Sequence, residues 1–150
     1  MSIMDAGQEF SDAQALGAIS NGSSVKSTNI IDNRASQLDE WQASRDPDLG
    51  NSVLNVAVNV ALVGASARIR AQLITKEADA SISSGGTVLA EVEIPAATVA
   101  GKSFGIKIPP GMLTKRYVGI LYTAVGANLT SATVDGWLSL DLETADNKKV

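Results

Sequence analysis

Alternation of apolar and polar residues limits the possible folds of this chain more than any other feature. It is clear between Ile108 and Leu142, a segment without a plausible catalytic group. Successive side chains of a strand point to opposite faces of a sheet, so a period of two predicts half-buried strands and is hard to reconcile with a helix. The apolar row of this segment comprises Val118, Ile120, Tyr122, Val134, Leu138, Leu140 and Leu142.

The same alternation recurs earlier in the chain. Its longest example, at residues 52–63, has an inner row that runs from Leu54 to Leu62 and includes Val60. Turn residues separate the runs, and no helical stretch long enough for a crossover lies between them, which disfavours a parallel sheet. We therefore expect an all-β fold, a jelly roll or antiparallel β-sandwich of about eight strands. Besides the two strands in the segment above, strands are predicted near Ile30 and at 52–63, 68–73, 88–94 and 104–108.

Length and composition fit one domain. A chain of 150 residues can bury about 70% of its unfolded surface without a disulfide or a metal. Hydrophobic residues make up 45% of the chain but aromatic residues only 4%, so the core must consist mainly of Val, Leu, Ile and Ala. We expect the sandwich core at 51–142 and a polar tail at 143–150. Residues 1–50 are expected to form an N-terminal arm, a short strand and a long loop of the same domain.

Two local features are expected in the polar N-terminal part. Ser11 and Gln14 have the spacing of a capping box, which favours a short helix ending at Gly17, although this spacing also arises by chance. Residues 38–50 indicate a loop, because the residue before Pro47 is disfavoured in a helix. A loop of this length is either a contact surface or flexible.

Side chains suited to catalysis are scarce. Cys and His are absent, which removes thiolate chemistry, the commonest general base and the commonest transition-metal ligand. Asp46 and Asp48 flank a proline but lack the spacing of an EF-hand. Glu91 and Glu93 share one face of one strand, which indicates a solvated edge or a patch facing a basic neighbour rather than an acid/base pair across a cleft. We therefore expect no enzymatic activity, no cofactor and no metal.

Charge and hydropathy limit the partners. The net charge is -4 and the 12 Lys and Arg residues are spread along the chain, which argues against nucleic acid. No apolar run approaches the roughly 20 residues needed to cross a bilayer, and the N-terminus lacks a basic region followed by a long apolar one. We expect a soluble protein that contacts no membrane.

Bulky residues outside the inner rows are candidates for a contact surface. Trp137 falls on the outward row of the last strand, where it is exposed unless something covers it. Exposed aromatic residues often anchor interfaces. Tyr117 and Leu121 either pack under a second layer or loop of the same chain or belong to such a surface. The candidate interface residues are Phe10, Arg34, Trp41, Arg45, Tyr117, Leu121 and Trp137.

Several short motifs follow one another in a particular order and spacing. They are Phe10 to Leu16, Ser27 to Asp32, Asp48-Leu49-Gly50, Pro109-Pro110-Gly111, Arg116-Tyr117-Val118, Tyr122-Thr123 and Leu138 to Asp141. This order is similar to that of the small capsid cement, or decoration, proteins of tailed bacteriophages, and the similarity spans residues 3–142. The chain departs from the plainest members of that family in its longer polar loop at 36–47 and in its tail at 143–150.

The resemblance implies a jelly roll that binds the outside of an icosahedral phage head and ties neighbouring major capsid proteins together, stabilising the shell against internal DNA pressure. It implies a small symmetric cluster, a dimer or trimer of the chain, located on the virion after synthesis in the bacterial host cytoplasm. Two alternatives stay open. One is a carbohydrate-binding jelly roll for receptor binding or adhesion, in which Trp41 or Trp137 stacks on sugar rings. The other is a different oligomeric component of the virion head or tail.

Overall fold

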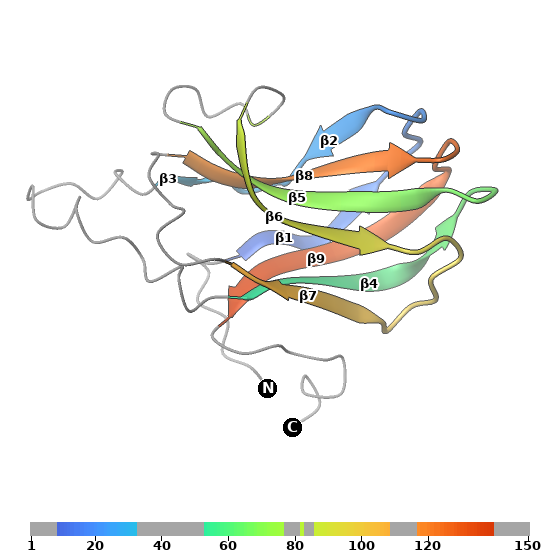
Figure 1. Ribbon diagram of the computed structural model, residues 1–150. Coiled ribbons are helices and arrows are strands. Elements are labelled where there is room, and N and C mark those ends of the chain that lie inside the picture. The colour runs from blue at the N-terminus through green and yellow to red at the C-terminus, as the bar shows by residue number, and fades with distance from the viewer. Residues whose placement is uncertain (1–8, 33–52, 77–81, 83–85, 109–116, 140–150) are drawn as a thin grey trace, which may run out of the picture.

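Two stacked sheets make up the part of the chain that the computed structural model describes, residues 9–32, 53–76, 82, 86–108 and 117–139 (Figure 1). The predicted loop at 38–50, the turn at 109–111 and the tail at 143–150 lie outside these residues, as do Leu140 and Leu142. Within the described ranges, no helix has the length and apolar character needed to cross a membrane.

Every strand pair among the described residues is antiparallel. The strands are β1 (Glu9–Leu16), β2 (Ser24–Lys26), β3 (Ile31–Asp32), β4 (Val53–Val63), β5 (Arg68–Lys76), β6 (Thr87–Ile94), β7 (Ser103–Lys107), β8 (Tyr117–Val125) and β9 (Ser131–Ser139).

The strand order is that of a jelly roll. One sheet has the order β1-β9-β4-β7 and the other has the order β2-β8-β5-β6, with the two-residue strand β3 also paired to β8. The chain pairs β1 with β9, β2 with β8, β4 with β7 and β5 with β6, so it resembles one long hairpin rolled up until its two layers face each other. This topology confirms the predicted all-β jelly roll.

The core lies between the two sheets and is mainly aliphatic, as the composition predicts. Alternate residues of each long strand point into it, such as Leu54, Val56 and Val58 of β4. Burial of these side chains is the main source of stability, at roughly 0.8 kcal/mol per CH₂ group. The largest fully buried side chains of this core are Phe10, Leu16, Leu54, Ile69, Leu73, Ile94, Ile108, Ile120, Tyr122 and Leu129.

Residues 9–16 form a strand, so the helix favoured by the capping-box spacing is wrong. The two side chains that suggested the helix do meet, because Ser11 Oγ donates a hydrogen bond of 2.6 Å to Gln14 Oε1. They meet across a bulge, where the pairing of β1 with β9 shifts register between Ser11 and Gln14 and Ala13 has a positive φ of 45°. A spacing of three residues brings side chains together both at a helix N-terminus and across a bulge.

The long strand β4 is also irregular. Leu54, Val56, Val58 and Leu62 of its predicted inner row are buried, but Val60 is 54% exposed. The pairing of β4 with β9 shifts register between Val58 and Val60. Because a bulge turns the residues beyond it relative to the sheet, the prediction that Val60 belongs to the core is wrong.

The first described segment belongs to the sandwich. β1 is the edge strand of one sheet, whereas β2 and β3 lie beside β8 in the other. The backbone amide of Asn29 donates a hydrogen bond of 2.8 Å to the carbonyl oxygen of Phe10, which ties the two sheets together at this edge. Residues 9–32 therefore contribute three strands to the fold, although their polar composition predicts part of an arm.

Candidate interaction surfaces

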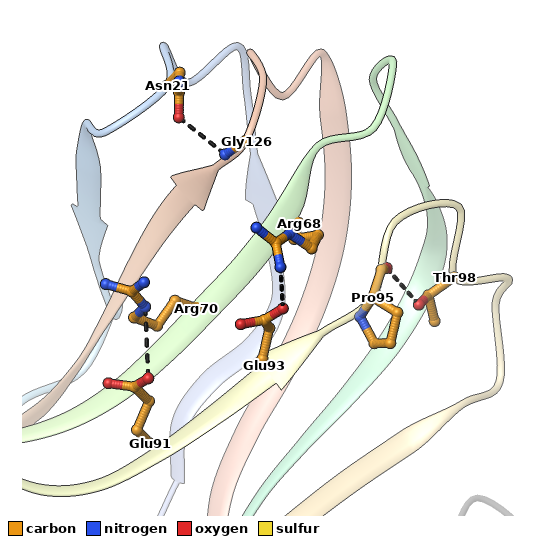
Figure 2. Close-up of polar contacts among 8 residues, drawn as sticks. All are labelled: Asn21, Arg68, Arg70, Glu91, Glu93, Pro95, Thr98 and Gly126. Carbon is orange, nitrogen blue, oxygen red and sulfur yellow. Dashed lines mark hydrogen bonds and ion pairs between the residues drawn. The ribbon is translucent and has the colours of Figure 1, made fainter.

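The outer side of β5 and β6 carries a row of charged and polar side chains, which we call the charged face. It consists of Arg68, Arg70, Gln72, Glu91 and Glu93. Arg68 Nη1 lies 2.8 Å from Glu93 Oε1, and Arg70 Nε lies 3.5 Å from Glu91 Oε1 (Figure 2). Gln72 Nε2 donates a hydrogen bond of 2.9 Å to Glu91 Oε2. The antiparallel register of β5 and β6 brings all of these groups together.

Each carboxylate of the charged face is thus paired with a guanidinium group from the neighbouring strand. The paired side chains are 39–46% exposed, and ion pairs this exposed contribute about 0–1 kcal/mol each. Glu91 and Glu93 form a patch that faces a basic neighbour, which is one of the two arrangements expected from their positions. They do not face each other across a cleft, as the acid/base pair of a glycosidase does.

Tyr117 and Leu121 lie on β8, where other residues of the chain bury Leu121 and partly bury Tyr117. Leu121 is 8% exposed and belongs to a small apolar cluster with Ile82, against which Ile30 and Tyr117 pack. Gly119 lies between them on the same strand and permits this close packing, since a Cβ atom there would lie 2.9 Å from Ile82 Cγ1. Tyr117 and Leu121 were expected either to pack under part of the same chain or to form an interface, and the structure favours packing within the chain.

The outer side of the sheet β1-β9-β4-β7 is buried around Trp137. We call this buried part, which lies outside the core between the sheets, the covered face. Trp137 is 1% exposed, and Asn55, its neighbour across the strands, is 0% exposed. Asn55 Nδ2 donates a hydrogen bond of 2.6 Å to Ser139 Oγ. Asp135 Oδ1 accepts one of 2.6 Å from the backbone amide of Ala13. The indole of Trp137 is therefore covered in the single chain and is not an exposed anchor.

The remaining interface candidates are Phe10 and three residues outside the described parts of the chain. Phe10 is 0% exposed and packs in the core between the sheets, so it is not on a surface. Arg34, Trp41 and Arg45 lie outside the described residues. The structure therefore brings Tyr117 and Leu121 together but does not join them to Phe10 or Trp137.

A chain of polar contacts runs from the core to the surface beneath the bulge of β1. Tyr122 Oη donates a hydrogen bond of 3.0 Å to Ser11 Oγ, which in turn donates to Gln14 Oε1. Gln14 Oε1 also accepts a hydrogen bond of 3.0 Å from the backbone amide of Thr28. Burial raises the pKa of Tyr122 well above its ordinary value near 10, so the phenol stays neutral. This chain of contacts positions β1, β8 and the segment between β2 and β3; it does not activate a nucleophile.

Sequence reasoning missed one apolar surface. Val60, Val63 and Val99 are 54%, 49% and 57% exposed. The backbone amide of Leu62 donates a hydrogen bond of 3.0 Å to the carbonyl oxygen of Thr98, which places the segment around Val99 beside the end of β4. The signal present in the sequence was the lack of charged residues near these valines, because a strand end or turn exposed to water ordinarily carries some.

No group of three or more acidic side chains in the described residues is arranged to hold a metal ion. A scan against protein-family models finds no match to this chain, and a search of curated proteins finds no relative. Function must therefore be inferred from the fold, the surfaces and the order of motifs.

Proposed function

We propose that this chain is a non-enzymatic capsid cement protein of a tailed bacteriophage. It binds the outer surface of the icosahedral head and clamps neighbouring major capsid proteins, which stabilises the shell against the pressure of the packaged DNA. Its partners are the major capsid protein and further copies of itself in a small homo-oligomer, a dimer or a trimer. It is made in the cytoplasm of the bacterial host and is located on the virion.

The observation that carries this proposal is the contact between motifs that resemble the cement family. Tyr122, in one motif, donates a hydrogen bond of 3.0 Å to Ser11 in another. Asn29, in a third motif, donates its backbone amide to the Phe10 carbonyl oxygen at 2.8 Å. Motifs far apart in the sequence thus form one network inside a jelly roll. This supports a resemblance of the whole fold rather than of unrelated short segments.

A rigid jelly roll is physically suited to clamping a shell. Internal pressure loads the seams between capsid subunits, and a protein bound across a seam adds contact area that must be lost before the subunits separate. A protein that binds only the intact arrangement stabilises it by mass action. Repetition over many symmetry-related positions lets modest contacts add up. None of these effects requires a catalytic group.

The direct test is to add the purified chain to heads assembled from the cognate major capsid protein alone. We expect saturable binding on the outer surface at symmetry-related positions, seen by electron cryomicroscopy, and a higher temperature of head breakage. Deletion of residues 1–8 leaves β1 complete and isolates the contribution of the terminal residues, whereas deletion through residue 20 would remove β1 and test only folding. Heads that stay undecorated at saturating protein would contradict the proposal.

The same experiment separates the alternatives. Binding to a glycan array without binding to heads would support the carbohydrate-binding module, although that function needs an exposed aromatic ring and Trp137 is 1% exposed. Location of the chain in the tail of whole particles would support a different virion component.

A further inference from the structure

Asn21 and Gly22 form the only Asn-Gly pair in the sequence. The side-chain amide of an Asn is a thermolabile group. It is lost most readily before Gly, because a glycine has no side chain to hinder the attack of its backbone nitrogen on the preceding side chain. Both residues are exposed, so water and base can reach them. The fate of this amide therefore depends on how the fold holds the backbone around it.

The pair occupies the two central positions of a tight turn between β1 and β2. The backbone amide of Ser23 donates a hydrogen bond of 2.9 Å to the carbonyl oxygen of Ser20, which closes the turn. Gly22 has a positive φ of 83°, a conformation that residues with a side chain rarely adopt. The residue that makes Asn21 reactive is thus the residue that the turn requires.

Hydrogen bonds to β8 and to the connection after it hold both reacting groups. The backbone amide of Gly22, which would be the nucleophile, donates a hydrogen bond of 2.8 Å to the carbonyl oxygen of Ala124. Asn21 Oδ1, on the amide that would be attacked, accepts a hydrogen bond of 3.0 Å from the backbone amide of Gly126 (Figure 2). The backbone amide of Asn21 donates a hydrogen bond of 2.8 Å to Asn128 Oδ1. Nucleophile and side chain cannot turn toward each other without breaking these contacts.

We propose that Asn21 is a site of covalent modification, spontaneous deamidation, whose rate the fold controls through these hydrogen bonds. The Gly22 nitrogen loses its proton to a base in solution and forms a bond with Asn21 Cγ. The bond from Cγ to Nδ2 breaks, Nδ2 takes up a proton and leaves as ammonia, and a cyclic succinimide remains. Water opens this ring at either carbonyl to give aspartate or isoaspartate, and no oxidant or reductant is needed. The rate therefore follows the population of chains in which the turn has opened locally.

The two products affect the turn differently. Aspartate has a side-chain oxygen that can still accept the hydrogen bond from Gly126. Isoaspartate carries the side-chain methylene in the main chain, which changes the spacing between the backbone nitrogens of residues 21 and 22. The contacts of these nitrogens with Asn128 and Ala124 cannot both be kept. Isoaspartate thus detaches the turn, whereas aspartate only adds a negative charge. This inference does not depend on the proposed function.

The first test compares the folded full chain with the same chain in urea at one pH and temperature. Peptide mass spectrometry follows the loss of Asn21, and labelling with isoaspartyl methyltransferase follows isoaspartate. We expect Asn21 to be modified at least about 10-fold more slowly in the folded chain, because the open turn is a minor state. Equal rates in the two states would overturn the inference, as would an Asn21 that stays unmodified in urea.

The second test loosens the turn by mutation. Asn128→Ala removes the acceptor of the Asn21 amide and should speed modification of the folded chain by about 2- to 10-fold, the factor that corresponds to one ordinary hydrogen bond. The matched control is Asn29→Ala, which loses a side-chain hydrogen bond to the Glu9 carbonyl oxygen outside the turn and should leave the rate unchanged. Circular dichroism confirms that both variants are folded. An unchanged rate in the Asn128 variant would contradict control by these contacts.

The third test separates the two products. Asn21→Asp reproduces aspartate alone, and the isoaspartate form is isolated chromatographically from aged protein. Hydrogen exchange should show a protected Gly22 amide in the Asn21→Asp variant and loss of this protection in the isoaspartate form, because only the second product changes the main chain. Equal protection in both forms would reject the predicted detachment of the turn.

Discussion

The outer rows of the two sheets differ in what covers them. On the charged face, the ion-paired side chains, such as Arg68 and Glu93, are 39–46% exposed. On the covered face, Asn55 and Trp137 are 0% and 1% exposed. Both rows occupy outward positions of antiparallel strands. A period of two therefore determines which residues share a face of a strand, but it does not determine whether that face meets water.

Residue type shows whether an outward row meets water only for the charged face. A row of Arg and Glu indicates solvent, because an unpaired charge costs several kcal/mol to bury. The outward row of β4 begins with Val53, Asn55 and Ala57, and these side chains fit either environment. Asn55 is tolerated in a buried row because its amide donates to Ser139 Oγ at 2.6 Å. The two faces thus differ in burial although both rows occupy outward positions of their strands. Mutation can test this difference.

The largest expected difference between the two faces comes from Trp137. Trp137→Ala removes a large buried side chain, so we expect a loss of about 3–5 kcal/mol in the free energy of unfolding. Urea denaturation followed by circular dichroism measures this loss. Ile106→Ala serves as the control on the same sheet, because Ile106 is 40% exposed and should cost less than about 1.5 kcal/mol. Equal losses for the two variants would mean that the outer side of this sheet is open in solution.

The amide side chains of Asn55 and Gln72 provide a second contrast with matched chemistry. Asn55→Ala removes a fully buried amide together with its hydrogen bond to the partly buried Ser139 Oγ, and should cost about 1–3 kcal/mol. Gln72 donates a hydrogen bond of 2.9 Å to Glu91 on the charged face, and Gln72→Ala should stay within about 0.5 kcal/mol, as expected where water replaces the donor. Thermal unfolding of both variants measures the difference. A Gln72 variant as unstable as the Asn55 variant would remove the distinction between the faces.

Tyr122, in the core between the two sheets, gives a reference for a fully buried side chain. Burial raises the folded-state pKa of Tyr122 above the unfolded value near 10. The folded chain keeps this proton at a pH where the unfolded chain releases it. The stability is therefore complete below pH 10 and falls above it, by up to about 1.4 kcal/mol per pH unit. Urea unfolding at rising pH measures how steeply the free energy of unfolding falls. Tyr122→Phe should remove the part of this fall that comes from the phenol. An identical slope in the Phe variant would show that Tyr122 is accessible to solvent.

Most of the sandwich can be predicted from alternation, because inward residues such as Leu54 and Val56 follow the period of the strand. The prediction fails at Val60, where a bulge after Val58 changes the direction of the side chains. The candidate surface is harder to predict than the fold. Alternation predicts the side of the strand on which Trp137 lies, but it contains no information about whether that side is covered, and Trp137 is 1% exposed.

The smallest expected effect is on the charged face, and it tests whether that face is exposed to water. A double-mutant cycle with Arg68→Ala and Glu93→Ala should give a coupling energy of about 0.2–1 kcal/mol, because both side chains are more than two-fifths exposed. Salt near 1 M should reduce the coupling toward zero, since the Debye length is then about 3 Å. A coupling that persists in salt would mean that the pair is shielded from water. The charged face would then be a buried interface in solution, and the two outer faces would differ in their partners rather than in their exposure.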